Sequence, residues 1–207
     1  MLLGIDTCGG AGSIVLARQS GSDIEPIAEA ELAGKTYSGL LIPKISELLD
    51  AQQAVPKNLN AIVVTHGPGS FTGIRVGLSA AKGLAVALNI PLLAVSRLAV
   101  LASKAATNAA ALDAGRGEFY FRIHSDEALL TPEDIRARLD ITLAVCEENA
   151  SQIFPNSILV PPPRAWDALL YALARLAAED FDDVDAVDGN YVRRSDAELF
   201  AQQAAKR

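Results

Sequence analysis

Two glycine-containing segments hold the residues of this chain that are best suited to bind an anion. In the first, Asp6 and Thr7 precede a turn that contains Gly9 and Gly10. Backbone N–H groups of such a turn can hold a phosphate, and the Asp6 carboxylate would then face a nucleotide-bound metal ion. The same residues also fit a polar hairpin, in which the Asp6 and Thr7 side chains satisfy N–H groups of the turn. Both interpretations are open on these residues alone.

The second segment, residues 67–73 (GPGSFTG), matches none of the common phosphate-binding or hydrolase motifs. It lacks the GK[ST] ending of a phosphate-binding loop, and it fits neither a GxGxxG nor a GxSxG pattern. Its residues predict a tight turn that leads into a helix, whose first N–H groups suit an anion. A purely structural turn explains the segment equally well.

Residues for nucleophilic or metal-assisted catalysis are sparse. The two histidines, His66 and His124, lie in no HExxH or other metal-ligand spacing. A triad of Ser70, His66 and Asp113 can be written down, but nothing in the spacing of these residues supports it. The sequence therefore predicts no catalytic residue and no metal site.

Short apolar runs and amphipathic spacing alternate along the first half of the chain. Three strands joined by short turns predict an antiparallel meander, and helices then alternate with buried parallel strands. The predicted ranges are 2–7, 13–17 and 27–32 for the meander, 38–52, 72–88 and 96–106 for the helices, and 60–65 and 92–95 for the later strands.

The second half repeats this style, with strands first and helices after them. The predicted ranges are 110–113, 118–123, 141–145 and 158–160 for strands, and helices from Thr131, over 164–178 and from Ser195. We therefore expect an α/β protein of two lobes. The expected N-terminal lobe is 1–105, with the C-terminal helix 195–207 as a candidate addition, and the shortened C-terminal lobe is 106–194.

The composition is that of a folded, acidic protein. Of the 207 residues, 50% are apolar and 21% are charged, and the net charge is −7. This charge argues against nucleic-acid binding by the chain alone, because phosphate contacts need clustered Lys and Arg. Cys8 and Cys146 form no CxxC pair, so we expect both to be reduced. The start of the chain has no basic leader, and no apolar run is long enough to span a membrane, which predicts a cytoplasmic protein.

Several segments, taken together and in this order, resemble one family. They are 3–7 (LGIDT) with 13–16, the block 67–77 (GPGSFTGIRVG) continued by 81–85 (AKGLA), 113–120, and 191–198. The chain resembles the TsaB (YeaZ) family of glycoprotease-like, peptidase M22-like proteins. The resemblance implies a two-lobed actin/Hsp70-like (ASKHA, ribonuclease H-like) α/β fold, with mixed sheets flanked by helices.

The resemblance also implies a role. It implies a non-catalytic subunit that binds and activates a TsaD-type transferase, which threonylcarbamoylates adenosine 37 of tRNA. A TsaE-type ATPase would join the assembly, tRNA would be contacted only indirectly, and the chain alone would form a homodimer. No intrinsic cofactor is expected. ATP or ADP would bind near Asp6, Thr7, Gly9 and Gly10 only when the partner is present.

Two further implications concern particular residues. The related transferase carries an HxxxH metal pair just after the strand that corresponds to 92–95, and those positions are Arg97 and Leu101 here, which are not metal ligands. The partner interface is expected on the helices 38–52 and 72–88, whose apolar and small residues exceed what a single core contact needs. The predicted interface residues are Leu41, Ile45, Leu48, Leu49, Gly73, Gly77 and Ala81.

Two alternatives are open at this point. In one, both helices are buried entirely within their own lobe and form no interface. In the other, the chain is an enzyme with its own active site, either a nucleotide hydrolase that uses Asp6 or an M22-type peptidase.

Overall fold

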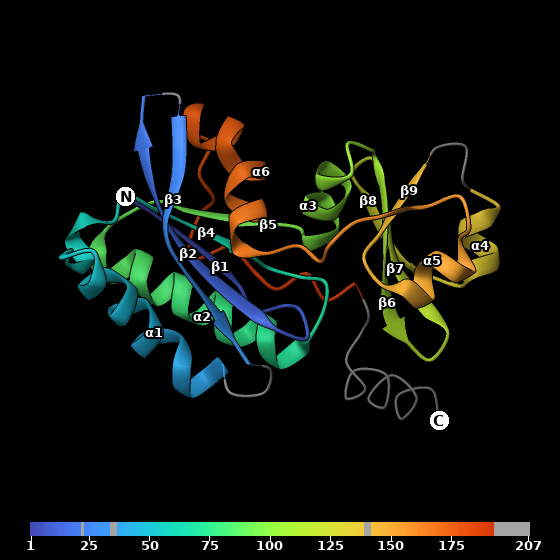
Figure 1. The fold of residues 1–207 in the computed structure, drawn as a ribbon, viewed down its shortest axis with the longest axis horizontal. Helices are drawn as coiled ribbons and strands as arrows, with labels where there is room; N and C mark the ends of the chain where they lie inside the picture. Colours follow the sequence, from blue (N-terminus) through green and yellow to red (C-terminus); the bar gives the residue numbers. More distant parts are fainter. Residues whose placement is uncertain (22, 34–36, 139–141, 193–207) are drawn as a thin grey trace.

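Two five-stranded mixed sheets form the two halves of the protein (Figure 1). The computed structural model describes residues 1–21, 23–33, 37–138 and 142–192. The first sheet has the order β3-β2-β1-β4-β5, made of Asp23–Leu32, Gly12–Ser20, Leu2–Asp6, Ala61–Thr65 and Leu92–Val95. The second has the order β8-β7-β6-β9-β10, made of Asp126–Leu130, Glu118–Ile123, Ala109–Gly115, Leu143–Val145 and Ile158–Leu159.

The two sheets share one topology. In each half, the first strand pairs antiparallel with the second, and the second pairs antiparallel with the third. The fourth strand then pairs parallel with the first, and the fifth pairs parallel with the fourth. The prediction of two α/β lobes of the same style is therefore confirmed.

The first sheet is covered on both faces. Helices α1 (Tyr37–Ala51) and α2 (Phe71–Leu88) lie side by side across one face, and α6 (Ala165–Ala177) covers the other (Figure 1). Leu3 of β1 packs on the side of α1 and α2, whereas Leu2 packs on the side of α6. A strand buried on both faces needs apolar residues at successive positions, which explains the continuous apolar runs of β1 and β4.

The helices that cover the second sheet differ from the predicted ones. Helices α4 (Pro132–Arg136) and α5 (Glu148–Ile153) pack on one face, and α3 (Arg97–Lys104) packs on the other. The sequence assigns α3 to the N-terminal lobe and α6 to the C-terminal lobe. In the structure, each of these helices packs against the sheet of the other half, because its apolar face fits that sheet.

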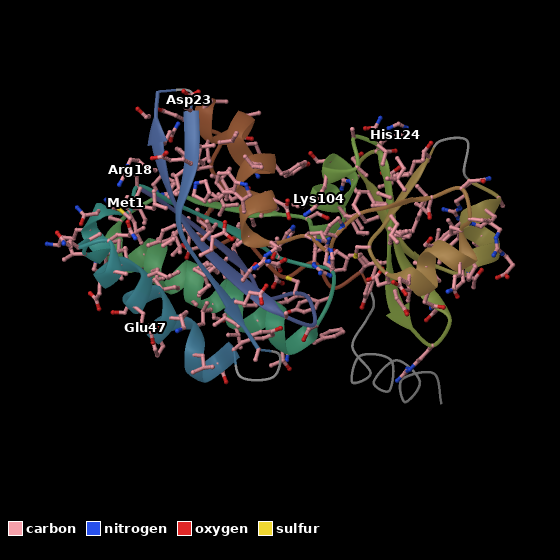
Figure 2. All side chains as sticks on the ribbon, viewed as in Figure 1. Met1, Arg18, Asp23, Glu47, Lys104 and His124 are labelled. Atoms are coloured by element: carbon pink, nitrogen blue, oxygen red, sulfur yellow. The ribbon has the colours of Figure 1, made fainter. Side chains whose placement is uncertain are left out.

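Helices α3 and α6 meet at the junction between the two halves. Lys104, at the end of α3, pairs with Asp167 of α6 at 2.7 Å (Figure 2). The side chains of both residues are largely buried. The two crossed helices therefore tie the halves together with an ion pair as well as with apolar contacts.

Helices α3 and α4 begin after the predicted capping residues Ser96 and Thr131, whereas α2 begins after Ser70, a cap that the sequence analysis did not predict. Ser70, Ser96 and Thr131 each accept a hydrogen bond from the N–H group three residues further on. The sequence analysis missed β8 and α5, because an edge strand and a six-residue helix are too short to show a clear period. A short 3-10 helix, η1 (Pro56–Asn58), precedes β4. The predicted helix from Ser195 and the predicted strand start at Ile141 lie outside the described residues.

Helix α2 approaches the end of β1 so closely that two of its positions have no room for a side chain. A Cβ atom on Gly73 would lie 1.9 Å from the carbonyl oxygen of Thr7, and one on Gly77 would lie 2.2 Å from the Thr7 hydroxyl oxygen. The Thr7 hydroxyl donates to the carbonyl oxygen of Gly73 at 2.6 Å. By its length and composition alone, α2 could cross a membrane. In the structure, however, the face of α2 that contains Gly73 and Gly77 packs against β1 and β4.

Replacing Gly73 with alanine should lower the free energy of unfolding by about 3 kcal/mol, because the added methyl group meets backbone that cannot easily move. Gly83, on the same helix, is the matched control, since a Cβ atom there meets nothing within 4 Å. Gly83→Ala should instead stabilise the protein by up to ~1 kcal/mol. Urea unfolding followed by circular dichroism measures both effects. Equal stability of the two variants would contradict the packing described above.

Candidate functional site

Asp6 ends β1 and is almost completely buried. Its Oδ1 atom accepts the N–H group of Cys8 at 2.9 Å and the hydroxyl of Thr65 at 2.6 Å. A carboxylate that accepts the N–H group two residues further on forms an Asx turn. These bonds support the polar-hairpin interpretation of Asp6.

Both cysteines are free thiols, as the sequence predicts. Burial raises the pKa of Cys8 to about 12, and the nearby Asp6 carboxylate acts in the same direction. Burial likewise raises the pKa of Cys146 to about 12. Neither residue is therefore a thiolate nucleophile near neutral pH.

Arg97, the first residue of α3, directs its guanidinium toward Asp6. Its Nε atom lies 3.7 Å from Asp6 Oδ2, and the residue is only 8% exposed. Burial alone would lower the pKa of Arg97, but the Asp6 carboxylate opposes this effect, and the pKa lies above its usual value. The contact is ionic rather than a hydrogen bond, because 3.7 Å is too long for one.

A cleft of about 710 Å³ lies beside this ion pair, at the junction of the two halves. It contains the turn after β1, the loop before α2, the end of β6, and residues of α1, α3 and β7. Its lining residues are Cys8, Gly9, Gly10, Tyr37, Gly69, Ser70, Arg97, Asp113, Ala114, Gly115, Tyr120 and Glu147. A second cavity of about 450 Å³ shares Gly10, Arg97 and Glu147 with the cleft.

The residues predicted to contact a nucleotide differ in their access to the cleft. Gly9 and Gly10 line it, whereas Thr7 is fully buried and its hydroxyl is bonded to α2. The Asp6 carboxylate accepts two hydrogen bonds at Oδ1 and faces Arg97 at Oδ2. A divalent ion on Asp6 would have to displace this guanidinium. The site therefore does not fit the metal-bound nucleotide that an actin-like fold implies.

Glu147 follows β9 and faces the cleft from the second half. Its Oε2 atom is buried and has no hydrogen-bond partner within the described part of the chain. Burial raises the pKa of Glu147, although Cys146 and Arg97 act against this effect. A raised pKa favours the neutral carboxyl, which can donate a hydrogen bond as well as accept one.

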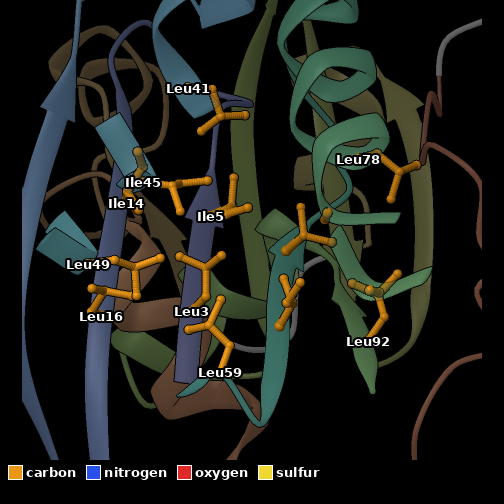
Figure 3. Close-up of a cluster of buried hydrophobic side chains, with 14 of the residues drawn as sticks. Leu3, Ile5, Ile14, Leu16, Leu41, Ile45, Leu49, Leu59, Leu78 and Leu92 are labelled. Atoms are coloured by element: carbon orange, nitrogen blue, oxygen red, sulfur yellow. The ribbon is translucent and has the colours of Figure 1, made fainter. Parts of the chain in front are cut away.

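The predicted interface residues Leu41, Ile45 and Leu49 point into the first sheet rather than outward (Figure 3). All three are buried in the core that α1 shares with β1 and β2. The other predicted interface residues are buried or half-buried as well: Leu48, Gly73, Gly77 and Ala81. This corrects the prediction, because periodicity identifies the apolar face of a helix but not the surface that covers it.

The same two helices nevertheless expose other large apolar side chains. Leu40 is 45% exposed and Ile42 is 49% exposed on α1, and Val86 is 67% exposed on α2. Leu40 and Ile42 flank the outer side of α1, because Leu41 between them faces the core. The helices are therefore not buried entirely within their own lobe.

The serine triad and a metal site find no support in the described residues. Ser70 and Asp113 line the cleft, whereas His66 lines another cavity and its Nδ1 atom lies 3.1 Å from the carbonyl oxygen of Asp188. No group of three or more Asp, Glu, His or Cys side chains that could hold a metal ion occurs within 1–21, 23–33, 37–138 and 142–192.

The sequence analysis missed the contribution of Arg97 to this site. It treated Arg97 only as a residue that cannot bind a metal ion. A cation at the first position of a helix is unfavourable for the helix dipole. That mismatch was the available signal that Arg97 has a specific anionic neighbour, which the structure identifies as Asp6.

Comparison with known proteins agrees with this architecture. A family model described as TsaD, tRNA N6-adenosine threonylcarbamoyltransferase, matches residues 28–138. The tRNA threonylcarbamoyladenosine biosynthesis protein TsaB of Escherichia coli is 32% identical over 155 residues, which cover 67% of this chain and 65% of that protein. The Bacillus subtilis protein of the same name is 37% identical over 123 residues, covering 58% and 52%. The matched part thus spans about half to two thirds of these relatives.

A solved structure of YeaZ from Pseudomonas aeruginosa superimposes with a TM-score of 0.73 at 26% identity, and covers 92% of this chain and 98% of that one. The fold is accordingly the two-lobed, actin/Hsp70-like (ribonuclease H-like) α/β fold. The chain belongs to the TsaB (YeaZ) family.

The raised pKa of Glu147 predicts a pH-dependent stability. Below about pH 4.3, where an unfolded glutamate titrates, the contribution of the protonated carboxyl is fully present. The wild type loses this contribution as pH rises through the raised folded pKa, whereas Glu147→Gln does not. We therefore expect the variant to gain stability relative to the wild type as the pH rises above about 4.3, as measured by urea unfolding. Glu148→Gln, which removes a carboxylate from an exposed neighbour, should show no such gain.

Proposed function

We propose that this chain is a non-catalytic subunit of tRNA threonylcarbamoyladenosine biosynthesis that binds and activates a TsaD-type transferase. The observation that carries the proposal is its 32–37% identity to proteins named for this biosynthesis. The match of residues 28–138 to the transferase family model supports a paralogous relation between the two partners.

The cleft supports a role without catalysis. Arg97 and Leu101 stand at the positions where the resemblance puts the metal pair of the transferase. Leu101 is fully buried among apolar residues, and Arg97 supplies a fixed positive charge next to Asp6. Activation would then work by differential binding, in which this subunit favours the conformation of the transferase that accepts its substrates.

The outer side of α1 and α2 is the surface that we assign to the partner. It exposes Leu40, Ile42 and Val86, and Gly83 on α2 leaves open space for the close approach of another helix. Exposed apolar groups of this kind favour a protein interface. A second copy of the chain would use the same surface, so the homodimer and the heterodimer would compete.

Other members of the assembly would depend on this pairing. A net charge of −7 leaves tRNA binding mainly to the partner. ATP or ADP would bind near Gly9 and Gly10 only within the complex, and a TsaE-type ATPase would join there. A role in tRNA modification fits a cytoplasmic protein.

Size-exclusion chromatography with light scattering tests this proposal, on the chain alone and mixed with the TsaD-type protein of the same organism. We expect a discrete heterodimer that replaces any homodimer. Failure to associate, with and without ATP, would overturn the proposal.

Replacing Leu40 and Ile42 together with glutamate should abolish the heterodimer and leave the circular dichroism spectrum unchanged. Both side chains are about half exposed, so the charges cost little in the folded monomer. Leu170→Glu, on the exposed side of α6, is the control and should still pair. Leu41→Glu should instead unfold the protein, because it buries a charge. Normal pairing by the double variant would contradict the surface assignment.

A further inference from the structure

Arg97 is a buried cation whose hydrogen-bonding capacity is not used by any described residue. A guanidinium has five N–H donors. Within the described residues the Arg97 side chain donates no hydrogen bond, and its Nε atom is both buried and unpartnered. Burying an ion without hydrogen bonds is costly, and the contact with Asp6 at 3.7 Å repays only part of that cost.

The Arg97 side chain borders open space as well as protein. Arg97 lines both the cleft of about 710 Å³ and the adjoining cavity of about 450 Å³. Asp6 holds its position through the hydrogen bonds from Cys8 and Thr65, so it does not need the guanidinium fork. The fork is thus available to a group that enters from the cleft.

Further donors surround the same place. Gly10 and Glu147 line both cavities with Arg97, and Gly9 lines the cleft. The N–H groups of Gly9 and Gly10 form no hydrogen bond with the described part of the chain. Within the described residues the buried Oε2 atom of Glu147 has no hydrogen-bond partner, and in its protonated form this carboxyl can donate to an anion. Successive N–H groups beside a guanidinium are a common arrangement for oxyanions.

The geometry points to an oxyanion site in which Arg97, with the N–H groups of Gly9 and Gly10, binds a small molecule through its phosphate or carboxylate group without a divalent cation. A guanidinium pairs with both groups through two parallel hydrogen bonds. The cleft volume lies within the range of small-molecule sites and exceeds the needs of a single ion. Arg97 holds the place that a metal ion would need beside Asp6, so its charge substitutes for that of the metal. This inference concerns the chain alone and a metal-free anion, whereas the binding of ATP or ADP proposed above depends on the partner.

Nuclear magnetic resonance of the 15N-labelled chain in EDTA tests this site, with inorganic phosphate and acetate as separate probes. We expect phosphate to shift the amide signals of Gly9 and Gly10 and the Nε–H signal of Arg97, with the same affinity when EDTA is replaced by Mg²⁺. A response to acetate alone would assign the site to carboxylates, and a response to phosphate would assign it to phosphate groups. The absence of shifts at these residues with either probe would overturn the inference, as would a requirement for Mg²⁺.

Two substitutions of Arg97 separate binding from folding. Arg97→Gln should weaken binding at least tenfold, since it removes a charge-assisted pair. Arg97→Lys keeps a cation beside Asp6, and therefore the fold, but it loses the planar fork and should also bind more weakly than the wild type. Arg18→Gln removes an exposed arginine from β2, far from the junction (Figure 2), and should bind as the wild type does. Unchanged affinity in the folded Arg97→Lys and Arg97→Gln variants would refute the site.

Discussion

The close approach of α2 to the end of β1 determines the geometry around the cleft. Gly73 and Gly77 leave no space for a Cβ atom against Thr7, and a Cβ atom on Gly69 would lie 2.2 Å from the carbonyl oxygen of Cys8. The glycine-rich block thus clamps the turn that follows β1. Its resemblance to an anion-binding loop has a structural explanation, since Ser70 caps the helix by accepting from the N–H group of Gly73. The proposed anion-binding donors lie instead in that turn itself, at Gly9 and Gly10, which line the cleft.

Because the turn is fixed, the Asp6 carboxylate faces the junction of the two halves. There, α3 meets α6 and supplies the cation that pairs with Asp6, namely Arg97. Arg97 belongs to the helix that follows the first sheet, yet that helix packs on the second. The guanidinium therefore lies beside Asp6 from one half, and Glu147 from the other half lines the same cleft. A buried ion pair adds little to stability compared with an apolar replacement of the same volume. Its presence beside a cleft is better explained by a ligand than by stability.

Sequence reasoning succeeded where a period or a cap determined the structure. Helices α1, α2 and α6 and the buried strands β1 and β4 follow from apolar spacing, and the caps Ser96 and Thr131 follow from capping chemistry. The exchange of α3 and α6 between the sheets could not be predicted, because an apolar helix face does not specify which sheet covers it. For the same reason, Leu41 was expected at an interface although it lies in the core, while its neighbours Leu40 and Ile42 are exposed. Arg97 and Asp6 are 91 positions apart along the chain, so their contact could be identified only from the folded structure.

The proposed partner surface and the cleft share one element. Helix α1 carries Leu40 and Ile42 on its outer side, and at its first residue the Tyr37 hydroxyl donates to the carbonyl oxygen of Gly9 at 3.0 Å. Tyr37 also lines the cleft and packs into the core of the first half. An anion that orders the turn at Gly9 would therefore affect α1 through the hydrogen bond between Tyr37 and Gly9 and through the packing of the Tyr37 ring. Linkage is reciprocal, so a partner that shifts α1 would change anion affinity by the same factor as the anion changes partner affinity. In the proposed complex, occupancy of the cleft would in this way change the affinity of the chain for its partner.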